Sequence, residues 1–579
     1  MKRAITSLFF VCQLFACLSQ TNILSTKQLA EDIMLGNYDP ADYTPGTVIN
    51  HPGDIVPAIM DGILPDSLKS YLLRLSAFET RNTGSDTLSS SRGIGAARRW
   101  VFQRFEQIGA ENGGRLIPSY LQFDRSICSV NQHRNVFAVL PGIDTSHQGI
   151  IIIEGHLDSR CETACDTACL AEGMEDNGSG TALVLELARV MSQFAFDRTI
   201  VFMATIGEEQ GLFGADAFAK YAKNKGIPIN AVLNNDVIGG IICGETSSPP
   251  SCPGLNDIDS TQVRLFSQGV NNSKHKQLAR FTKLQYVEEL LGLVSVPMMV
   301  TIMSAEDRTG RGGDHIPFRE QGFAAIRFTS ANEHGNANTD DPNYHDRQHT
   351  TKDVLGVDTD GDNVLDSFFV DFNYLARNAV INGVSAGMAA IGPETPVDFT
   401  ATRTADSVFV EITDPFDYGE YRVFYRSTTN DFDTIFTVFQ KNAGLPNAAG
   451  LLRVSVAAVD GNGVESLFSG EKTLSVVSGA DEVANGRATP PIELYQNRPN
   501  PFDEATYIVY QVKEPISYRE AYLVIANLEG REIKRMPISL HEGENEVLYT
   551  HGYNVLGIYT YSLEVDGKVV DTKQMVFAN

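Results

Sequence analysis

Five acidic or imidazole side chains directly follow apolar, β-branched runs, at positions where strands are expected to end. They are His156, Asp158, Glu208, Glu209 and Asp236. Imidazole nitrogens and carboxylate oxygens are ligands that Zn²⁺ takes in proteins. A carboxylate beside such an ion can also act as the general base of a hydrolytic reaction. The residue types and their positions therefore indicate a metal-dependent hydrolytic site.

The elements that must position these groups alternate between strand and helix. Strands are expected at 133–142, 150–155, 199–206, 231–235 and 324–328, and helical segments between 66 and 109, at 179–194 and at 369–390. Such alternation is typical of an α/β fold with a mostly parallel sheet and helices on both faces. In open α/β sheets the site lies beyond the carboxyl ends of the strands, where these five residues fall.

Two further groups extend the candidate site to a pair of metal ions. Asp176 lies in the acidic loop before the helix at 179–194, and His349 lies far along the chain. An aspartate can bridge two ions through its two oxygens. Two zinc ions about 3.5–4 Å apart share a water molecule, lower its pKa and polarise a carbonyl. Gly207 permits a turn that aims Glu208 at this water while Glu209 binds metal.

Asp158 has a separate expected role. It lies two residues after His156. At this spacing its carboxylate can accept a hydrogen bond from the ring nitrogen of His156 that does not bind metal. Such partners fix the orientation of a metal-binding imidazole. We therefore expect Asp158 to support catalysis through His156.

The chain from residue 63 to 390 resembles the co-catalytic zinc aminopeptidase family, which also includes glutaminyl cyclases and glutamate carboxypeptidases. The matching motifs are GHLD (155–158), EDNGSG (175–180), GEEQGLFG (207–214), NDVIG (235–239) and HTTKD (349–353). The resemblance implies that one zinc is held by His156 and Asp236 and the other by Glu209 and His349. It further implies that Asp176 bridges the two ions and that Glu208 is the general base.

Other positions in the same region carry weaker assignments. Asp314 and His315 match a family segment near the substrate and are not expected to bind metal. His345 lies only four residues before His349 and is the alternative ligand. The residues 160–172, which include three cysteines, form an insertion relative to compact family members and could shape the rim of the pocket.

The leading functional hypothesis is a secreted or cell-surface di-zinc aminopeptidase that hydrolyses peptides with a free N-terminus. The motif at 207–214 resembles the aminopeptidase branch more than the cyclase branch. A glutaminyl cyclase or a carboxypeptidase-like zinc hydrolase on the same scaffold is the first alternative. A catalytically inactive binding protein is the second, and it should have lost ligands, whereas none is missing from the sequence.

The N-terminus and the composition indicate export. Residues 1–19 combine a basic start with a short apolar stretch, as a signal peptide does. The segment around Cys17 also resembles a lipoprotein box, which leaves lipidation open. The formal net charge of −26 argues against nucleic acid as a partner. No later stretch reaches the roughly 20 apolar residues needed for a transmembrane segment.

Six cysteines follow the signal peptide. They are Cys128, Cys161, Cys165, Cys169, Cys243 and Cys252. An even number in an exported chain favours disulfides, with about 15 connectivities if all six pair. Cys243 and Cys252 flank a short loop and are the easiest pair to close. The spacing of Cys161, Cys165 and Cys169 also allows a sulfur metal site, which an oxidising compartment disfavours.

The rest of the chain divides into small all-β units after a peptidase domain at 20–393. Alternating apolar residues predict a β-sandwich at 394–478 that resembles fibronectin type III modules. A linker follows at 479–491. Residues 492–579 are again alternating and resemble the C-terminal sorting domain read by the type IX secretion machinery. That resemblance implies this machinery as a partner, and the outside or outer surface of a Gram-negative bacterium as the location.

One acidic loop resembles part of a calcium site. Counting from Asp358, oxygen donors stand at positions 1, 3, 5 and 9 through Asp358, Asp360, Asp362 and Asp366. An EF-hand loop also needs a glutamate at position 12, where this chain has Phe369. The alternative interpretation is an aspartate-rich turn without an ion.

Overall fold

The computed structural model describes most of the chain. The described residues are 20–147, 149–242, 256–269, 272–307, 311–332, 346–404, 406–427, 430–448, 450–474, 492–502, 505–527, 532–551 and 557–577. The predicted signal peptide (1–19), Cys17, Cys243, Cys252, His345 and the predicted linker (479–491) lie outside these ranges.

A nine-stranded sheet forms the centre of the peptidase domain. In spatial order its strands are β1 (Thr21–Ser25), β2 (Ile117–Ile127), β3 (Val130–Leu140), β5 (Ile200–Thr205), β4 (Ile150–His156), β6 (Ile229–Asn235), β9 (Ala325–Ser330), β7 (Gln262–Phe266) and β8 (Met299–Ile302). The four central strands, from β5 to β9, are parallel. The sheet as a whole is mixed and not mostly parallel, because the β1–β2–β3 meander and the reversed strand β7 add antiparallel pairs.

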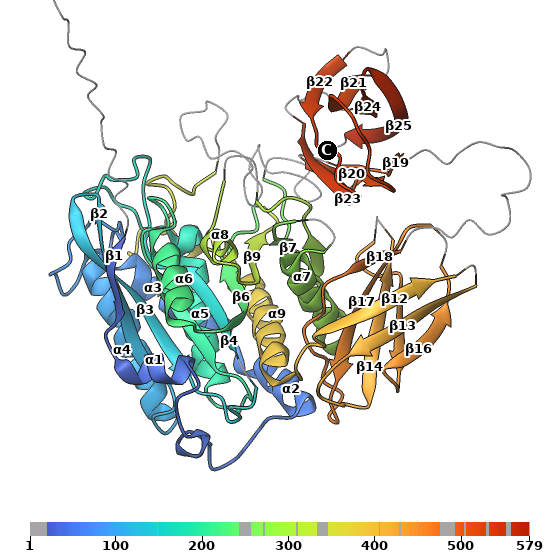
Figure 1. Ribbon diagram of the computed structural model, residues 1–579. Coiled ribbons are helices and arrows are strands. Elements are labelled where there is room, and N and C mark those ends of the chain that lie inside the picture. Colours follow the sequence, from blue (N-terminus) through green and yellow to red (C-terminus); the bar gives the residue numbers. More distant parts are fainter. Residues whose placement is uncertain are drawn as a thin grey trace, which may run out of the picture.

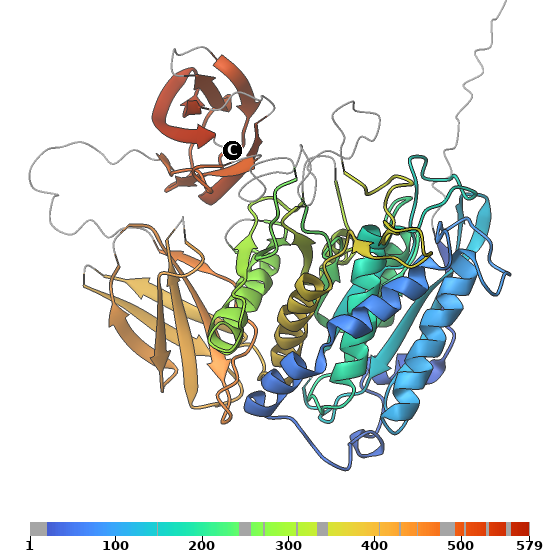
Figure 2. The ribbon, with the colours of Figure 1, turned by 180° about the vertical axis from the view of Figure 1, so that it is seen from behind.

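Helices cover both faces of this sheet (Figures 1 and 2). They are α1 (Gln28–Met34), α2 (Pro52–Gly62), α3 (Pro65–Ser76), α4 (Gly93–Glu111), α5 (Ser179–Met191), α6 (Phe213–Lys225), α7 (Lys274–Gln285), α8 (His315–Glu320) and α9 (Phe372–Ile391). Helices α3, α5 and α9 pack together on one face, and α6 packs with α8 on the other. Leu183 and Leu187 of α5 are fully buried, as a core-facing stripe requires. Among the described residues, no helix has the length and apolar character needed to cross a membrane.

Two small all-β domains follow the peptidase domain. The first combines a sheet of β12 (Asp398–Arg403), β13 (Ser407–Thr413) and β16 (Asn442–Pro446) with a sheet of β15 (Thr434–Val438), β14 (Glu420–Arg426), β17 (Leu452–Val459) and β18 (Lys472–Leu474). The second combines β19 (Ile492–Leu494), β20 (Ala505–Val512) and β23 (Gly543–Thr550) with β22 (Glu532–Pro537), β21 (Ala521–Asn527), β24 (Gly557–Val565) and β25 (Lys568–Phe577).

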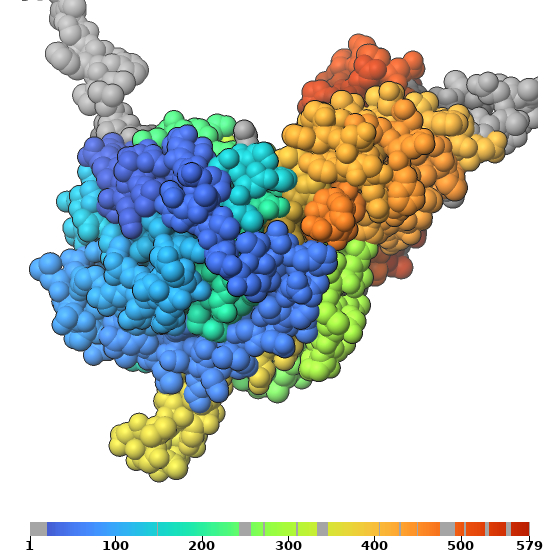
Figure 3. All heavy atoms as spheres, turned by 90° about the horizontal axis from the view of Figure 1, so that it is seen from below, coloured from blue at the N-terminus to red at the C-terminus, as the bar shows by residue number. Residues whose placement is uncertain are grey.

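The first of these domains, which we call the first sandwich, packs tightly on the peptidase domain. The ring of Phe468 packs edge to face against that of Phe281 in α7, with ring centroids 5.8 Å apart. Phe424 and Phe468 are part of the same buried apolar cluster as the peptidase core. Figure 3 shows the first sandwich, in orange, against the light green segment of the peptidase domain. The second domain, which we call the C-terminal domain, has a separate core.

Candidate metal centre

The carboxyl ends of the parallel strands bring the first three predicted ligands together. His156 is the last residue of β4, Asp236 directly follows β6, and Asp176 precedes α5. Nε2 of His156 lies 3.2 Å from Oδ1 of Asp176 and 3.4 Å from Oδ1 of Asp236. One imidazole and two carboxylates therefore converge on a single point beyond the sheet.

A second group of ligand atoms lies on the other side of Asp176. Nε2 of His349 is 3.0 Å from Oδ2 of Asp176 and 3.4 Å from Oε2 of Glu209. Asp176 thus directs one carboxylate oxygen toward each group. This arrangement is the one required of a residue that bridges two metal ions.

The buried atoms of these residues fit a metal better than they fit each other. Within the described ranges, Nε2 of His156 and Oε1 of Glu209 are buried and make no hydrogen bond of acceptable geometry. Buried polar atoms normally have a partner, so such orphans require an explanation. Each group offers one imidazole and two carboxylates, a donor set that suits zinc. The residues present therefore fit two zinc ions.

The electrostatics of the two adjacent glutamates reflect desolvation of their carboxylates among like charges. Burial, together with the carboxylates of Asp236 and Asp314, raises the pKa of Glu208 well above its usual value. Burial and the charges of Asp176 and Glu208 raise the pKa of Glu209 in the same way. Burial also acts to raise the pKa of Asp176, but His156 and His349 outweigh it and hold that pKa well below its usual value. Without a cation, the site therefore favours protonated glutamates.

Glu208 occupies the position expected of a general base. Gly207 has φ of +76°, which lets the chain turn sharply after β5. The turn places Oε2 of Glu208 at 3.9 Å from Nε2 of His156. Glu208 also lines a cavity of about 310 Å³ together with Glu209, Arg160 and His349. A carboxylate that faces both the ligands and the cavity can receive a proton there.

Asp158 contacts His156 differently from the prediction. Its backbone carbonyl accepts the hydrogen bond from Nδ1 of His156 at 3.0 Å, while its carboxylate lies 3.5 Å away. The buried carboxylate instead accepts from the hydroxyl of Thr83 at 3.0 Å and from the backbone N–H groups of Glu208 and Glu209, both at 3.3 Å. Asp158 thus holds the turn that carries the base and a ligand.

Asp314 and His315 lie behind the ligands and not among them. Asp314 directly precedes α8 and accepts a hydrogen bond from the hydroxyl of Thr205, the last residue of β5. Burial raises the pKa of Asp314 to about 7. Nε2 of His315 donates to the carbonyl of Glu306 at 3.1 Å. Among the described residues, neither side chain belongs to the two groups of ligand atoms around Asp176.

Several supporting residues had not been singled out from the sequence. Asp353 accepts hydrogen bonds from the backbone N–H groups of Glu175 and Asp176, at 2.9 and 3.0 Å, and so holds the bridging loop. Arg327 in β9 lies 3.2 Å from Oδ2 of Asp236. Arg327 could have been noticed in the sequence, because it is a charged residue within a stretch of apolar residues predicted to be a buried strand. Asp353 ends the HTTKD motif, but nothing in the sequence indicated its partners.

Arg160 contacts two of the candidate ligands, His349 and Glu209. Its guanidinium lies 2.9 Å from Nδ1 of His349 and 3.4 Å from Oε2 of Glu209. It begins the predicted insertion at 160–172, which the structure braces with disulfides Cys161–Cys169 and Cys128–Cys165. The insertion therefore shapes the rim of the metal cavity through Arg160.

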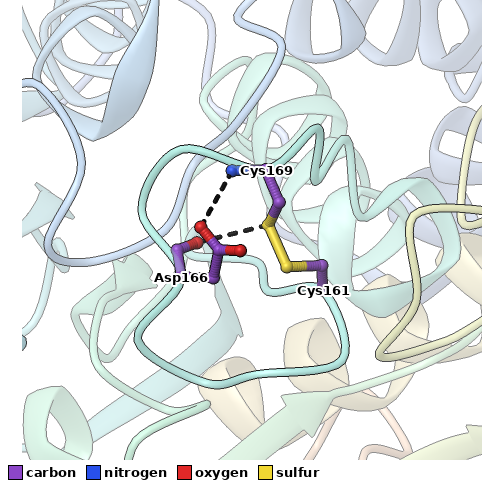
Figure 4. Close-up of side chains that lie close together, drawn as sticks. All are labelled: Cys161, Asp166 and Cys169. Carbon is purple, nitrogen blue, oxygen red and sulfur yellow. Dashed lines mark hydrogen bonds between the residues drawn. A yellow bond between two sulfur atoms is a disulfide. The ribbon is translucent and has the colours of Figure 1, made fainter.

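The same disulfides decide between the two interpretations of the cysteines. Cys161, Cys169 and Asp166 lie close together (Figure 4), as a sulfur metal site would require. Both sulfurs, however, are joined in a disulfide and have no thiolate to offer a metal. Asp166 accepts hydrogen bonds from the backbone N–H groups of Ala168 and Cys169, at 3.0 and 3.1 Å. The cluster is a braced turn, and the prediction of disulfides is confirmed for these cysteines.

The aspartate-rich loop brings three of its four predicted oxygen donors together. Carboxylate oxygens of Asp358, Asp360 and Asp366 lie within 4.8 Å of one another, and Asp362 is not part of this group. Asp358 already accepts from the backbone N–H groups of Gly361 and Asn363, at 2.6 and 2.7 Å. The loop is thus well ordered by its own hydrogen bonds, and calcium binding stays a prediction.

Comparisons with known proteins identify the family to which the chain belongs. Residues 135–361 match the model of peptidase family M28. A probable zinc metalloprotease of Pyricularia oryzae is 32% identical over 374 residues, which cover 62% of this chain and 71% of the relative. A second, from Leptosphaeria maculans, is 31% identical over 400 residues, covering 66% of this chain and 88% of the relative. The chain therefore belongs to peptidase family M28, a family of zinc metallopeptidases.

Solved structures with a similar arrangement include two kinds of enzyme. The LapA aminopeptidase of Legionella pneumophila has a TM-score of 0.42 at 17% identity, covering 60% of this chain and 77% of that chain. A glutaminyl cyclase of Porphyromonas gingivalis has a TM-score of 0.37 at 16% identity, covering 56% of this chain and 98% of that chain.

Proposed function

We propose that the protein is a two-zinc aminopeptidase that removes residues from the free N-terminus of peptides. The observation that carries the proposal is the position of Asp176 between two ligand groups. One group contains His156 and Asp236, and the other contains Glu209 and His349. Membership of a zinc metallopeptidase family supports the metal and the class of bond that is cleaved.

The protein residues divide the work around the metals. Zinc, when bound, lowers the pKa of water and polarises a carbonyl. Glu208 takes a proton from the attacking water at its carboxylate and delivers it to the departing amine. Its raised pKa makes Glu208 a stronger base than an ordinary glutamate, which favours acceptance of that proton. The carboxylate of Asp158 holds Glu208 in place by accepting a hydrogen bond from the backbone N–H of Glu208.

A free N-terminus is favoured by the carboxylates that line the cavity. Glu208, Glu209, Asp176 and Asp236 all border it. An α-ammonium can donate to acceptors of this kind, whereas an acetylated amine has lost both its charge and two of its donors. A buried acceptor left unpaired costs about 1–3 kcal/mol. We therefore expect an acetylated peptide to be cleaved about ten- to a hundredfold more slowly than the same peptide with a free amine.

Three arginines in the same cavity favour a second candidate function. Arg160, Arg311 and Arg327 line it together with the acidic residues, and Arg327 is paired with Asp236. Guanidinium groups bind carboxylates well. A peptide could therefore enter with its C-terminal carboxylate toward these arginines, which would make the enzyme a carboxypeptidase-like zinc hydrolase.

One panel of substrates separates these candidates. Zinc content should be measured by elemental analysis, followed by hydrolysis of one peptide in free, N-acetylated and C-amidated forms, with Glu208→Gln as the inactive control. An aminopeptidase cleaves the free and amidated forms and spares the acetylated form. Cleavage of the free and acetylated forms only would establish the carboxypeptidase-like alternative. Release of ammonia from an N-terminal glutamine, without peptide cleavage, would identify a cyclase.

We further propose that the domains after residue 393 serve export and display. The first sandwich has three strands in one sheet and four in the other, as fibronectin type III modules do. The C-terminal domain is proposed to be the signal for type IX secretion, on the basis of its sequence resemblance. Deleting residues 492–579 should then leave the enzyme inside the cell envelope, and unchanged export of the truncated chain would reject this role.

A further inference from the structure

A cavity lies where all three domains meet, away from the metal centre. Its volume is about 130 Å³. Lys276 and Arg280 of α7 line it from the peptidase domain, Asp431 from the first sandwich, and Arg498 and Tyr507 from the C-terminal domain. Figure 1 shows α7 below the C-terminal domain and beside the first sandwich. None of these residues lines the metal cavity.

Three cations, of Lys276, Arg280 and Arg498, and one carboxylate, of Asp431, line this cavity. Asp431 is shared by Lys283, at 2.8 Å, and Arg498, at 3.1 Å. Glu471 is likewise shared by Arg280, at 3.3 Å, and by Arg426, whose Nη2 donates at 2.7 Å. Each carboxylate thus already balances two cations. Neither has a charge left for another cation nearby.

Lys276 is a nearby cation that neither of these carboxylates balances. Its side chain is buried, with the residue 4% exposed, and its ammonium donates to the backbone carbonyl of Met303. In the part of the chain that the structure describes, Lys276 forms no ion pair within 4 Å. An ammonium group has three donors, so one carbonyl does not satisfy it. Burial and the neighbouring charges of Arg280 and Arg498 lower the pKa of Lys276 well below its usual value.

The arginines leave donors unused at the same place. Nη1 of Arg498 and Nε of Arg280 are buried without a hydrogen-bond partner among the described residues. Buried donors of charged groups are costly to leave unpaired. The cavity thus gathers one unmatched ammonium and two under-satisfied guanidinium groups. An acceptor with negative charge is the missing partner.

We propose that this cavity binds a small tetrahedral oxyanion, sulfate or phosphate, which fastens the C-terminal domain to the peptidase domain. Such an ion has four oxygens and can accept charge-assisted hydrogen bonds from ammonium and guanidinium groups at once. The cavity volume of about 130 Å³ is adequate for such an ion. A cavity of about 150 Å³ holds benzene, which is larger than sulfate or phosphate. Since Lys276 and Arg498 belong to different domains, one ion bound to both links those domains.

The test is a titration of the zinc-loaded, full-length protein with sodium sulfate. Sulfate is expected to bind with a stoichiometry of one per chain by calorimetry and to raise the Tm in a saturable way. Sodium chloride at equal ionic strength should not reproduce the rise. A Tm that responds equally to both salts, or an absence of saturable heat, would overturn the proposal. Repeating the titration with sodium phosphate in the same zinc-loaded protein, and subtracting the response of Lys276→Met, shows which of the two ions the site prefers.

Two matched variants locate the site. Lys276→Met should abolish the sulfate response, and without sulfate it should be at least as stable as the wild type, because it removes a buried, unmatched charge. Lys274→Met is the control, since Lys274 is exposed and donates to the carbonyl of Gly322 instead. A full sulfate response in Lys276→Met would place the ion elsewhere and contradict the proposal.

Hydrogen exchange tests the link between the domains. In the wild type, saturating sulfate should slow exchange in α7 and in the segment from Arg498 to β20 together, and in Lys276→Met it should slow neither. Sulfate binding that leaves exchange in the C-terminal domain unchanged would refute the role in fastening that domain.

Discussion

Replacing Asp158 by asparagine tests how the catalytic turn is held. The carboxylate accepts hydrogen bonds from the backbone N–H groups of Glu208 and Glu209, both at 3.3 Å, and from the hydroxyl of Thr83 at 3.0 Å. An asparagine amide has only one oxygen. Its NH₂ group must then face at least one of the same donors. The general base and a metal ligand should therefore both lose part of their support.

The size of the effect follows from the bonds that are lost. A hydrogen bond to a charged group contributes about 1.5–3 kcal/mol. At about 1.4 kcal/mol per factor of ten, losing one such bond from the transition state lowers kcat/KM by about ten- to a hundredfold. The assay is steady-state hydrolysis of a chromogenic aminoacyl substrate, with zinc content measured in parallel. We expect zinc to be retained more fully than activity, since four of the five ligands are untouched.

A pair of variants at Thr83 provides the matched control. The hydroxyl of Thr83 donates to Asp158 and accepts from the N–H of Gly207 at 3.1 Å. Thr83→Ser keeps both bonds and should stay near wild-type activity, while Thr83→Val should fall partway toward Asp158→Asn. If Asp158→Asn keeps kcat/KM within about threefold, the carboxylate does not hold the turn in the way described here.

Three further substitutions test other parts of the structure. Glu208→Gln should keep zinc and lower kcat by about a hundred- to ten-thousandfold, the usual contribution of a general base; near-normal kcat would show that Glu208 is not the base. His349→Ala should lower zinc content by elemental analysis and His345→Ala should not, and the reverse result would move the ligand role to His345. Burial lowers the pKa of His275 from 6.5 to about 4. Between these pH values the unfolded chain binds a proton that the folded chain does not. The free energy of unfolding should therefore fall by up to about 3 kcal/mol as the pH drops from about 6.5 to 4. His275→Asn retains an acceptor for the N–H of Ala325 and should flatten this fall in urea unfolding at pH 7 and pH 4.5; an unchanged slope would contradict the assignment.

The central part of the fold was accessible from the sequence, and its edges were not. Strands β4, β5, β6 and β9 are rich in consecutive apolar residues because both of their faces are buried, and such runs are easy to recognise. Strands β7 and β8 are short and follow or precede irregular segments, so neither their existence nor the reversal of β7 could be inferred. Strand β1 joins the sheet through partners a hundred residues away, at Gln122 and Asp124. Register between such distant segments is decided by packing and not by local pattern.

The site, like the fold, could be predicted from the sequence only in part. The side chains at the predicted strand ends fall within recognisable motifs, and the structure brings His156, Asp176, Asp236, Glu209 and His349 together. Spacing does not determine which atom of a residue faces which neighbour, and this is why the carbonyl of Asp158, not its carboxylate, accepts from His156. The contacts of Arg160 required knowledge of the disulfides, which 15 connectivities left open at the outset. Motifs thus indicated the candidate ligands, whereas the residues that hold them in place depend on tertiary contacts.

The charge balance of the site explains why metal and stability must be linked. Burial raises the pKa of Glu208 and of Glu209 well above the usual value, so the metal-free fold favours protons on these carboxylates. Zinc requires its carboxylate ligands in the deprotonated form, and it therefore competes with those protons. The desolvation that raises the pKa of Glu208 also makes the empty site costly to ionise. In the proposed mechanism, the desolvation of Glu208 and Glu209, just after β5, thus couples the proton that Glu208 would carry to the metal that Glu209 would bind.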